Sequence, residues 1–293
     1  MVKGTIVKAL SGFYYVQIED GILECKARGR FRLDGTSPLV GDKVQCIIDS
    51  NGKGRIEQVE ERKNWFIRPA VANVDALVFV AANTNPVTDP FLIDRVSVIA
   101  EDADCELIVC INKTDIDPAD ELYDIFSKAG FTVIKTSAES CEGIDELRAV
   151  LKGKICAFTG NSGVGKSSIL NVLLPGINIR TGEVSEKLGR GRHTTRHVEL
   201  YDLGDGILAA DTPGFASFDI EMMNIIPKEE LQYDFREFAP YIGKCRFNNC
   251  AHLKEPGCAV TEALSSGDIG ASRYRSYVRL YELSAQHKSW ETK

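Results

Sequence analysis

The 293-residue sequence lacks the long apolar runs that would cross a membrane. None of its hydrophobic stretches approaches the ~20 residues that a membrane-spanning helix needs, and its N-terminus lacks a signal-peptide pattern. Its nine cysteines follow no regular spacing, which excludes the disulfide framework of a small secreted protein. We therefore expect a cytoplasmic protein in a reducing environment, working as a monomer and with no membrane among its partners.

A net positive charge is also missing, because 35 Lys and Arg stand against 42 Asp and Glu, for a net charge of −7. With 44% apolar and 26% charged residues, the chain has a globular composition, and its length predicts two or three domains. Basic residues are nevertheless concentrated in residues 26–32, in residues 187–196 and at Arg273, Arg275 and Arg279. Such clusters are usually solvated faces, but three of them on an acidic chain favour contact with RNA.

The rest of the chain is organised around a glycine-rich stretch that fits the P-loop pattern G-x-x-x-x-G-K-[ST]. A buried strand is expected before it over residues 155–159, and a helix after it over residues 167–174. In a P-loop the backbone N–H groups wrap the α- and β-phosphates, the lysine reaches the β- and γ-phosphates, and the following hydroxyl ligates Mg²⁺. We predict that Lys166 is catalytic and that Ser167 binds Mg²⁺. The predicted phosphate-binding residues are Gly160, Asn161, Ser162, Gly163, Val164, Gly165, Lys166, Ser167 and Ser168.

Two further motifs argue against a chance glycine-rich turn and indicate that the nucleotide is GTP. An N-K-x-D element follows the apolar strand 106–111, and a D-x-x-G element follows residues 207–210, each where open α/β sheets bind ligands. Asp115 is the predicted guanine reader, because its carboxylate can accept from both N1–H and the exocyclic amino group. A serine-alanine pair after the strand 131–135 is expected beside the base. The added nucleotide-binding residues are Asn112, Lys113, Thr114, Asp115, Ser137, Ala138, Asp211 and Gly214.

The order of these motifs is permuted. An ordinary GTPase begins with the P-loop, whereas here N-K-T-D and S-A come first and D-T-P-G comes last. Such a rearrangement is possible where the original termini lie close together. The cut falls within switch II, the segment that the γ-phosphate orders. The region after Gly214 is therefore the expected readout of the nucleotide state.

The first ~60 residues read as five short strands separated by glycine-containing turns, which predicts a small closed barrel. An OB-fold is the first expectation and an SH3-like barrel the second. Arg28, Arg30, Phe31 and Arg32 would suit a surface that binds phosphates and stacks on bases. A barrel with a purely structural role is the alternative.

The C-terminal region contains three cysteines and a histidine within fourteen residues, in the pattern C-x4-C-x-H-x5-C. Three thiolates and one imidazole are typical of a closed structural zinc site, which leaves no open position for catalysis. The predicted ligands of one zinc ion are Cys245, Cys250, His252 and Cys258. A helix is expected from residue 268 to 286, with its tyrosines packed against this module.

Together these features resemble the circularly permuted RsgA (YjeQ) GTPase family over essentially the whole chain. The resemblance implies GTP hydrolysis stimulated by the 30S ribosomal subunit, a role in late maturation of that subunit, contact with 16S rRNA, and a zinc-bound C-terminal domain. We expect an OB-like RNA-binding barrel over residues 1–65, a permuted α/β GTPase domain over 66–216 and a mainly α zinc-binding domain over 217–293. A nucleotide-gated RNA-binding module is the rival interpretation, and a signalling GTPase is disfavoured by the lack of a lipid anchor.

Hydrolysis is expected to need help, because regulatory GTPases commonly carry a water-orienting glutamine just after D-x-x-G. This chain has Phe215 there, and phenylalanine cannot orient water. His193, in a loop that resembles the family's switch I, is the candidate for the missing catalytic group, with an ordinary exposed histidine as the alternative. Thr195 is the predicted switch I ligand of Mg²⁺ and a catalytic residue, with Thr194 as second choice.

Overall fold

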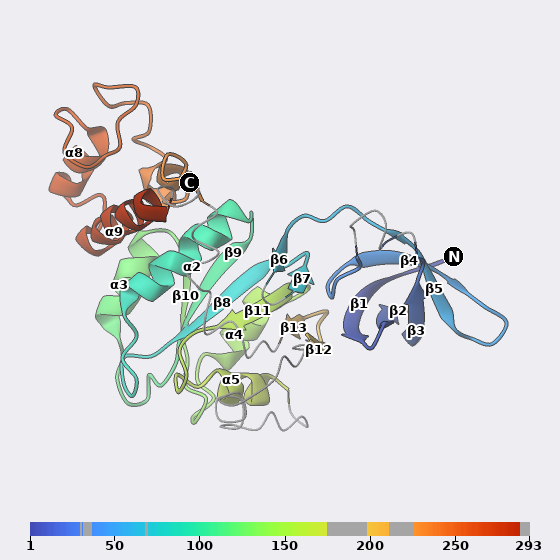
Figure 1. Ribbon diagram of the computed structural model, residues 1–293. Coiled ribbons are helices and arrows are strands. Elements are labelled where there is room, and N and C mark those ends of the chain that lie inside the picture. The colour runs from blue at the N-terminus through green and yellow to red at the C-terminus, as the bar shows by residue number, and fades with distance from the viewer. Residues whose placement is uncertain (30, 32–36, 68–69, 175–197, 211–225, 288–293) are drawn as a thin grey trace.

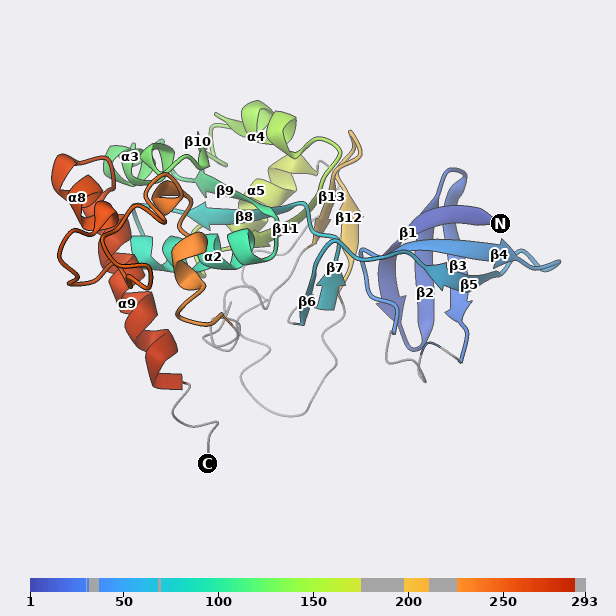
Figure 2. The same ribbon diagram turned by 90° about the horizontal axis from the view of Figure 1, so that it is seen from above.

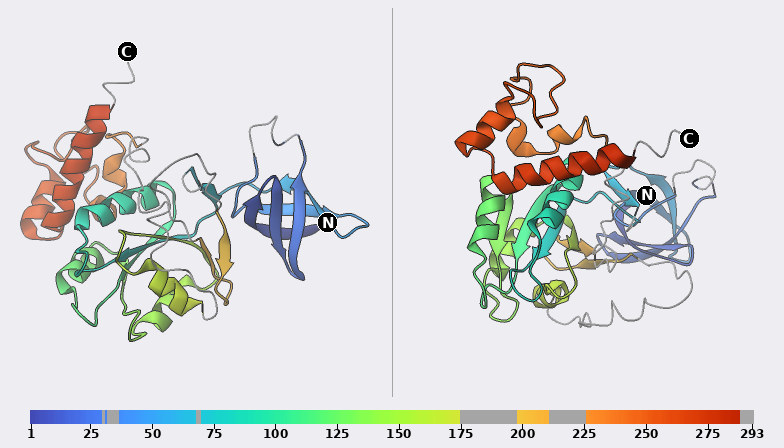
Figure 3. Two further views of the ribbon diagram at one scale, coloured as in Figure 1. Left: turned by 60° about the horizontal axis from the view of Figure 1, so that its bottom comes forward. Right: turned by 60° about the vertical axis from the view of Figure 1, so that its left-hand side comes forward.

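The computed structural model describes residues 1–29, 31, 37–67, 70–174, 198–210 and 226–287. An N-terminal β-barrel, a central sheet covered by helices and a C-terminal helical module follow one another along the chain (Figure 1). The barrel and the C-terminal module lie at opposite ends of the central sheet (Figure 3). Among the described residues no helix combines the length and the apolar character needed to span a bilayer.

The N-terminal barrel closes in the order β1-β2-β3-β5-β4, with β3 and β5 parallel and the other neighbours antiparallel. Alternate side chains fill its interior, among them Ile6, Val16, Val44 and Ile56, none of which is more than 1% exposed. The predicted OB-like barrel is confirmed. Its strands are β1 (Val2–Leu10), β2 (Phe13–Ile18), β3 (Gly21–Ala27), β4 (Lys43–Ile48) and β5 (Gly54–Val59).

The structure corrects the surface assigned to this barrel. Phe31 was expected to stack on bases, but its side chain is only 7% exposed and belongs to the hydrophobic core. Arg28 is paired with Glu57 at 2.7 Å, and Arg30 and Arg32 lie outside the described residues. A large aromatic side chain near the barrel wall gains more from burial than from exposure to water, so Phe31 has a structural role.

The central sheet has the order β10-β9-β8-β11-β13-β12. Its first five strands are parallel, and the short β12 pairs antiparallel with β13 at the edge. A two-stranded hairpin, β6 (Trp65–Ile67) with β7 (Ala70–Ala72), connects the barrel to this sheet. The sheet strands are β8 (Ala76–Ala81), β9 (Glu106–Ile111), β10 (Thr132–Lys135), β11 (Ile155–Thr159), β12 (Leu200–Asp202) and β13 (Leu208–Ala210).

Helices cover both faces of the sheet, which makes it an α/β domain. Along β8, Leu77 and Phe79 belong to one hydrophobic cluster with side chains of α2 and α3, whereas Val78 and Val80 belong to a second cluster with those of α4 and α5. Figure 2 shows α2 and α4 on opposite sides of the strands. The helices are α2 (Pro90–Asp102), α3 (Asp120–Lys128), α4 (Ile144–Leu151) and α5 (Lys166–Leu173).

The C-terminal module consists of η2 (Leu231–Tyr233), η3 (Arg236–Phe238), α8 (Ala259–Ser266) and α9 (Ala271–His287). As predicted, tyrosines of the last helix pack against the cysteine-rich loop. The hydroxyl of Tyr274 donates to the backbone oxygen of His252 at 2.7 Å, and that of Tyr277 donates to Ala251 at 2.8 Å. The fold class predicted from the sequence is confirmed in all three regions.

Candidate nucleotide and metal sites

The P-loop connects the end of β11 to the start of α5, and its glycines are required by close approaches. Gly165 has φ +98°, and a Cβ there would lie 2.2 Å from Nδ2 of Asn112. Gly160 has φ +129°, and its Cβ would lie 2.1 Å from the backbone oxygen of Val80. Because the clashing groups belong to β8 and to the residue directly after β9, the loop has this path only with glycine at these two positions.

The ammonium group of Lys166 lies inside this loop. Its Nζ donates to the backbone oxygens of Gly160 at 2.6 Å and Asn161 at 2.7 Å. Ser167 and Ser168 follow in the first turn of α5, where their side chains are partly buried. The helix N-terminus adds partial positive charge from its unpaired N–H groups. This end of the sheet can therefore bind an anion with several phosphate groups.

Asn112 joins three of the four predicted nucleotide elements: its own N-K-x-D motif, the P-loop and the serine-alanine loop. It follows β9 directly and is 2% exposed. Its side-chain Nδ2 donates to the backbone oxygen of Val164 in the P-loop at 2.9 Å. Its Oδ1 accepts from the backbone N–H of Ala138 at 3.1 Å. One amide side chain thus fixes the phosphate loop relative to the loop expected beside the base.

The other N-K-x-D residues lie around the same edge. Lys113 has φ +66°, and its Nζ donates to the backbone oxygen of Asn85 at 2.5 Å. The hydroxyl of Thr114 donates to the backbone oxygen of Thr136 at 2.9 Å, next to the fully buried Ser137. Asp115 is exposed, and no hydrogen bond of its carboxylate is found within the described ranges. Asp115 can therefore accept bonds from a ligand.

The loop after β8 was not assigned to the site from the sequence, although Lys113 contacts it. In addition to Asn85, this loop contains Asn83, whose Nδ2 donates to Asp117 at 3.0 Å. The hydrogen bonds from Asn83 and from the backbone N–H of Ala119 lower the pKa of Asp117. Two asparagines after an apolar strand were the signal that could have identified this wall of the site.

Four predicted site residues lie outside the described residues: His193, Thr195, Asp211 and Gly214. Their assigned roles rest on the sequence alone, as do those of Thr194 and Phe215. The strands that flank these segments, β12 and β13, are described and form the sheet edge next to the P-loop strand β11.

The predicted metal ligands of the C-terminal module come together. One ligand atom from each of Cys245, Cys250, His252 and Cys258 lies within 4.8 Å of all the others. The sulfurs of Cys245 and Cys258 are 3.9 Å apart, and Nδ1 of His252 lies 3.5 and 3.4 Å from them. Tetrahedral zinc with Zn–S bonds of ~2.3 Å separates two sulfurs by ~3.8 Å. The spacing therefore fits a tetrahedral ion.

The chemistry of the donor atoms also fits a cation. All nine cysteines are free, so no disulfide occupies the cluster. Burial raises the pKa of Cys250 to about 12, with a further contribution from the neighbouring thiols, so that without a metal this thiol holds its proton. Burial lowers the pKa of His252, which keeps its imidazole neutral and able to coordinate. Metal binding at this cluster would release protons from the thiols.

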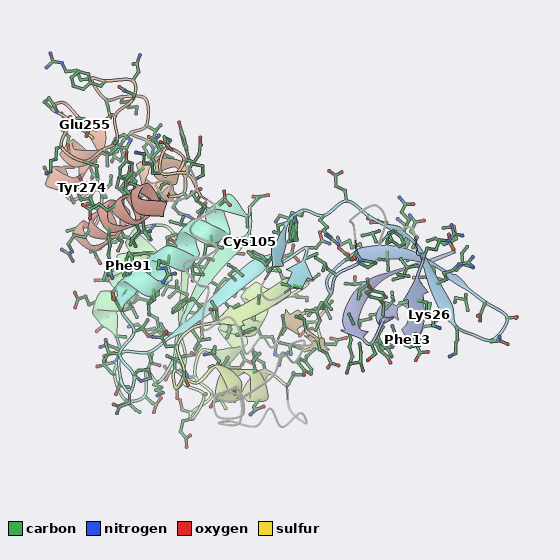
Figure 4. All side chains as sticks on the ribbon, viewed as in Figure 1. Phe13, Lys26, Phe91, Cys105, Glu255 and Tyr274 are labelled. Atoms are coloured by element: carbon green, nitrogen blue, oxygen red, sulfur yellow. The ribbon has the colours of Figure 1, made fainter. Side chains whose placement is uncertain are left out.

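Residues outside the predicted set hold the metal-binding loop in shape. The carboxylate of Glu255, labelled in Figure 4 with Tyr274, accepts from the backbone N–H groups of Ala251 at 2.9 Å, Leu253 at 2.9 Å and Lys254 at 3.0 Å. Partial burial raises the pKa of Glu255, but these backbone hydrogen bonds lower it by more, so the pKa is lowered overall. A glutamate between two metal ligands was the signal in the sequence that could have identified this role.

Two family descriptions match the chain and together cover most of it. Residues 3–56 match the RsgA N-terminal domain, and residues 59–221 match the RsgA GTPase. The chain therefore belongs to the RsgA GTPase family, and the resemblance inferred from its motifs is confirmed.

Curated relatives and solved structures agree with this assignment over nearly full length. The small ribosomal subunit biogenesis GTPase RsgA of Caldanaerobacter subterraneus subsp. tengcongensis is 47% identical over 282 residues, covering 95% of this chain and 94% of that protein. Its namesake from Halalkalibacterium halodurans is 44% identical over 295 residues, covering 98% and 99%. The crystal structure of YjeQ from Thermotoga maritima is 38% identical with a TM-score of 0.84, covering 97% and 98%. That of YloQ, a circularly permuted GTPase, is 35% identical with a TM-score of 0.81, covering 98% and 96%.

Proposed function

We propose that this chain hydrolyses GTP to GDP and phosphate and acts in the biogenesis of the small ribosomal subunit. One observation carries the proposal. The side chain of Asn112 holds the P-loop and the loop at Ala138 together at the carboxyl edge of a parallel sheet, in a member of the RsgA GTPase family. This edge is where α/β sheets bind nucleotides.

The proposed nucleotide contacts follow from the chemistry of each group. Asp115 accepts two hydrogen bonds from guanine, a pattern that adenine cannot offer. Lys166 exchanges its bonds to the loop carbonyls for bonds to the β- and γ-phosphates, which neutralises charge in the transition state. Ser167 and Thr195 are the proposed Mg²⁺ ligands, with Asp211 acting through a water molecule and the Gly214 N–H meeting the γ-phosphate. Bound Mg²⁺ would neutralise charge on the phosphates.

Turnover is proposed to be slow for the isolated chain and fast on the 30S subunit. Phe215 offers no group that could orient the attacking water, so His193 supplies it when the segment 187–196 contacts 16S rRNA. A missing group supplied in this way can accelerate phosphoryl transfer by ~10³-fold or more.

The remaining assignments extend the same proposal. The domains are residues 1–65, 66–216 and 217–293, and the last of them binds one structural zinc ion. The protein works as a cytoplasmic monomer that contacts 16S rRNA through basic surfaces and no membrane.

The deciding experiment is single-turnover GTP hydrolysis with purified 30S subunits, with 50S subunits and without ribosomes. We expect stimulation by 30S subunits only, which added salt weakens because phosphate contacts are salt-dependent. His193→Ala should bind GTP and 30S subunits normally but lose the stimulated rate. An absence of stimulation in the wild type would favour the nucleotide-gated RNA-binding module instead.

Base specificity is tested separately. Asp115→Asn should weaken GTP binding and favour xanthosine triphosphate, because an amide can donate to the second carbonyl of xanthine. Asp124→Asn, an equally exposed carboxylate on α3, is the matched control and should leave both affinities unchanged. Wild-type GTP affinity in Asp115→Asn would remove Asp115 from the base pocket.

A further inference from the structure

The imidazole of His252 makes a contact on the side away from the cysteines. Its Nδ1 faces the sulfurs of Cys245 and Cys258 at 3.5 and 3.4 Å. Its Nε2 lies 2.8 Å from Oε1 of Gln232, a residue of η2 that is twenty positions earlier in the chain. The histidine therefore lies between the proposed metal position and a single side-chain amide.

The orientation of the Gln232 amide is fixed by its other end. Its Nε2 donates to the backbone oxygen of Glu229 at 2.9 Å. If the amide were reversed, its oxygen would face that carbonyl oxygen, and its N–H groups would face the histidine. A carbonyl oxygen can only accept, so His252 must carry its proton on Nε2. That tautomer leaves the lone pair of Nδ1 pointing at the cysteines.

We propose that Gln232 is a positioning residue of the metal site, which holds the His252 ring in the tautomer and orientation that let Nδ1 bind zinc. The proposal rests on the metal binding proposed above. A hydrogen bond to the free nitrogen of a metal-bound histidine fixes the ring and raises its basicity, and its loss typically costs 10–100-fold in metal affinity.

The other contacts of His252 do not replace this hydrogen bond. The hydroxyl of Tyr274 holds the backbone oxygen of the histidine, not its ring. Phe238 and Tyr277 approach the ring with centroids 6.1 and 6.4 Å away, and such aromatic contacts do not distinguish one ring nitrogen from the other. Without Gln232 the ring would keep its place in the core but lose the contact that selects Nδ1 as the ligand.

The position of Gln232 in the chain gives this contact a further consequence. The four proposed ligands lie between residues 245 and 258, whereas Gln232 precedes them and follows the D-x-x-G motif at Asp211. The metal site thus includes a contact from the part of the chain that leads from the nucleotide motif into the module.

The test measures zinc affinity by competition with a chelator in the full-length protein. Gln232→Leu, which keeps the size and removes the acceptor, should weaken zinc binding 10–100-fold. Gln232→Glu keeps an acceptor for Nε2–H but loses the donor to Glu229, so it should bind zinc more tightly than Gln232→Leu. Gln17→Leu is the matched control, because Gln17 donates to Asp202 far from the module. Thermal unfolding at saturating zinc checks that each variant folds.

A second readout separates positioning from general stabilisation. Long-range ¹H–¹⁵N spectra of the zinc-loaded wild type should show His252 with a proton on Nε2 and metal on Nδ1, and Gln232→Leu should show a mixture or exchange. In an His252→Ala background, Gln232→Leu should change zinc affinity by no more than about twofold, because the two residues act through one contact.

Two outcomes would overturn the proposal in distinguishable ways. If the wild type takes up no zinc, both the metal site and the role of Gln232 are wrong, whereas the GTPase assignment is tested independently by turnover. If the wild type binds zinc but Gln232→Leu retains wild-type affinity and a single tautomer, only the role of Gln232 is wrong.

Discussion

The two ends of the central domain hold their neighbours by different physical means. One of the contacts between the barrel and the sheet edge is the ion pair of Lys8, whose Nζ lies 3.0 and 2.9 Å from the two carboxylate oxygens of Glu199, with side chains 33% and 36% exposed. The C-terminal module contacts α2 through Arg273, which is 1% exposed and donates to the fully buried Asp94 at 2.6 Å. The Lys8–Glu199 contact is partly exposed to water, and the Arg273–Asp94 contact is excluded from it.

The difference in burial decides how each contact responds to change. Exposed ion pairs contribute ~0–1 kcal/mol because water and salt screen them. A buried pair can contribute little when intact, yet it costs ~3–5 kcal/mol to break, because one charge is left without compensation. The Lys8–Glu199 ion pair can therefore be lost at little cost, whereas loss of the Arg273 ion pair leaves buried charges without a partner and costs more.

Arg273 is satisfied on several sides, which is the condition for burying a guanidinium group. Besides Asp94 it donates to Ser97 at 3.0 Å and to the two oxygens of Glu237 at 2.7 and 3.1 Å. It also stacks on Phe235, with 4.7 Å to the ring centroid. A second arginine of the module, Arg279, lies 3.8 Å from the ring of Phe91 on α2. Arg273 and Arg279 thus contact aromatic and acidic side chains of both α2 and the C-terminal module.

The largest expected effect comes from removing the metal. Structural zinc contributes ~10 kcal/mol or more to a small module, so a chelator should unfold the region after residue 226. Cys250 and Cys258 belong to the part of the large hydrophobic cluster that lies in the module, whereas the barrel and sheet strands bury side chains of their own, so both should stay folded. Hydrogen exchange resolved by region measures this. Equal loss of protection in the barrel would show that the two ends do not behave independently.

The second effect comes from breaking the buried joint. Arg273→Ala should destabilise the module by ~3–5 kcal/mol, because Asp94 and Glu237 would remain buried without their partner. Arg275→Ala on the same helix, where the side chain is exposed, is the matched control and should change stability by no more than about 0.5 kcal/mol. Denaturant unfolding followed by far-UV circular dichroism gives the change in unfolding free energy for both variants. Similar losses in the two variants would contradict the role of burial.

Arg273 also marks where prediction from the sequence ends. The sequence placed it in a basic cluster for RNA, and the structure shows that it is buried, so that part of the expectation was wrong. Its partner Asp94 is 179 positions away in the chain. No local pattern connects two such residues, because their pairing depends on how α9 packs against α2.

The elements that the sequence did predict depend on local patterns. Alternating apolar residues and glycine turns identify the barrel, and Cys245 with its three neighbours lies within one short loop. The P-loop glycines are also recognisable from their local spacing, although the steric limits at Gly160 and Gly165 come from Val80 and Asn112, which are distant in the chain. Contacts between residues distant in the sequence, such as Asn112 with Val164 or Gln232 with His252, could be identified only from the structure.

A smaller effect is expected from pH on the stability of the C-terminal module where it packs against α2. Burial raises the pKa of Asp234 to about 7, and the carboxylates of Asp102, Glu101 and Glu230 add to this. The folded state therefore keeps a proton that the unfolded state releases at ordinary carboxyl pKa. Stability from this group is complete below about pH 4, falls as the pH rises, and levels off above about pH 7, by no more than about 4 kcal/mol.

Asp234→Asn should remove this part of the pH dependence and stabilise the module at pH 8. The matched control is Asp268→Asn, an exposed carboxylate of the same module. Unfolding midpoints between pH 4 and pH 8 give the comparison. A wild-type module whose stability rises between pH 5 and pH 7, with no change in Asp234→Asn, would show that Asp234 is not the group responsible.

The smallest effect is expected at the exposed barrel contact, and it sharpens the comparison most directly. A double-mutant cycle of Lys8→Ala and Glu199→Ala should give a coupling energy of ~0.2–1 kcal/mol, because both side chains remain accessible to water. The coupling should shrink as salt is raised from 50 mM to 500 mM, since screening lengths fall over that range. The matched control is the ion pair of Lys3 and Glu60, which lies within the barrel at 3.0 Å. It should give a similar coupling energy. Glu199 adjoins β12, the strand that follows the proposed switch segment 187–196, and the backbone bridge between Lys8 and Glu199 remains when their side chains are removed. A salt-independent coupling energy above about 2 kcal/mol would mean that the Lys8–Glu199 pair behaves like the buried Arg273–Asp94 pair.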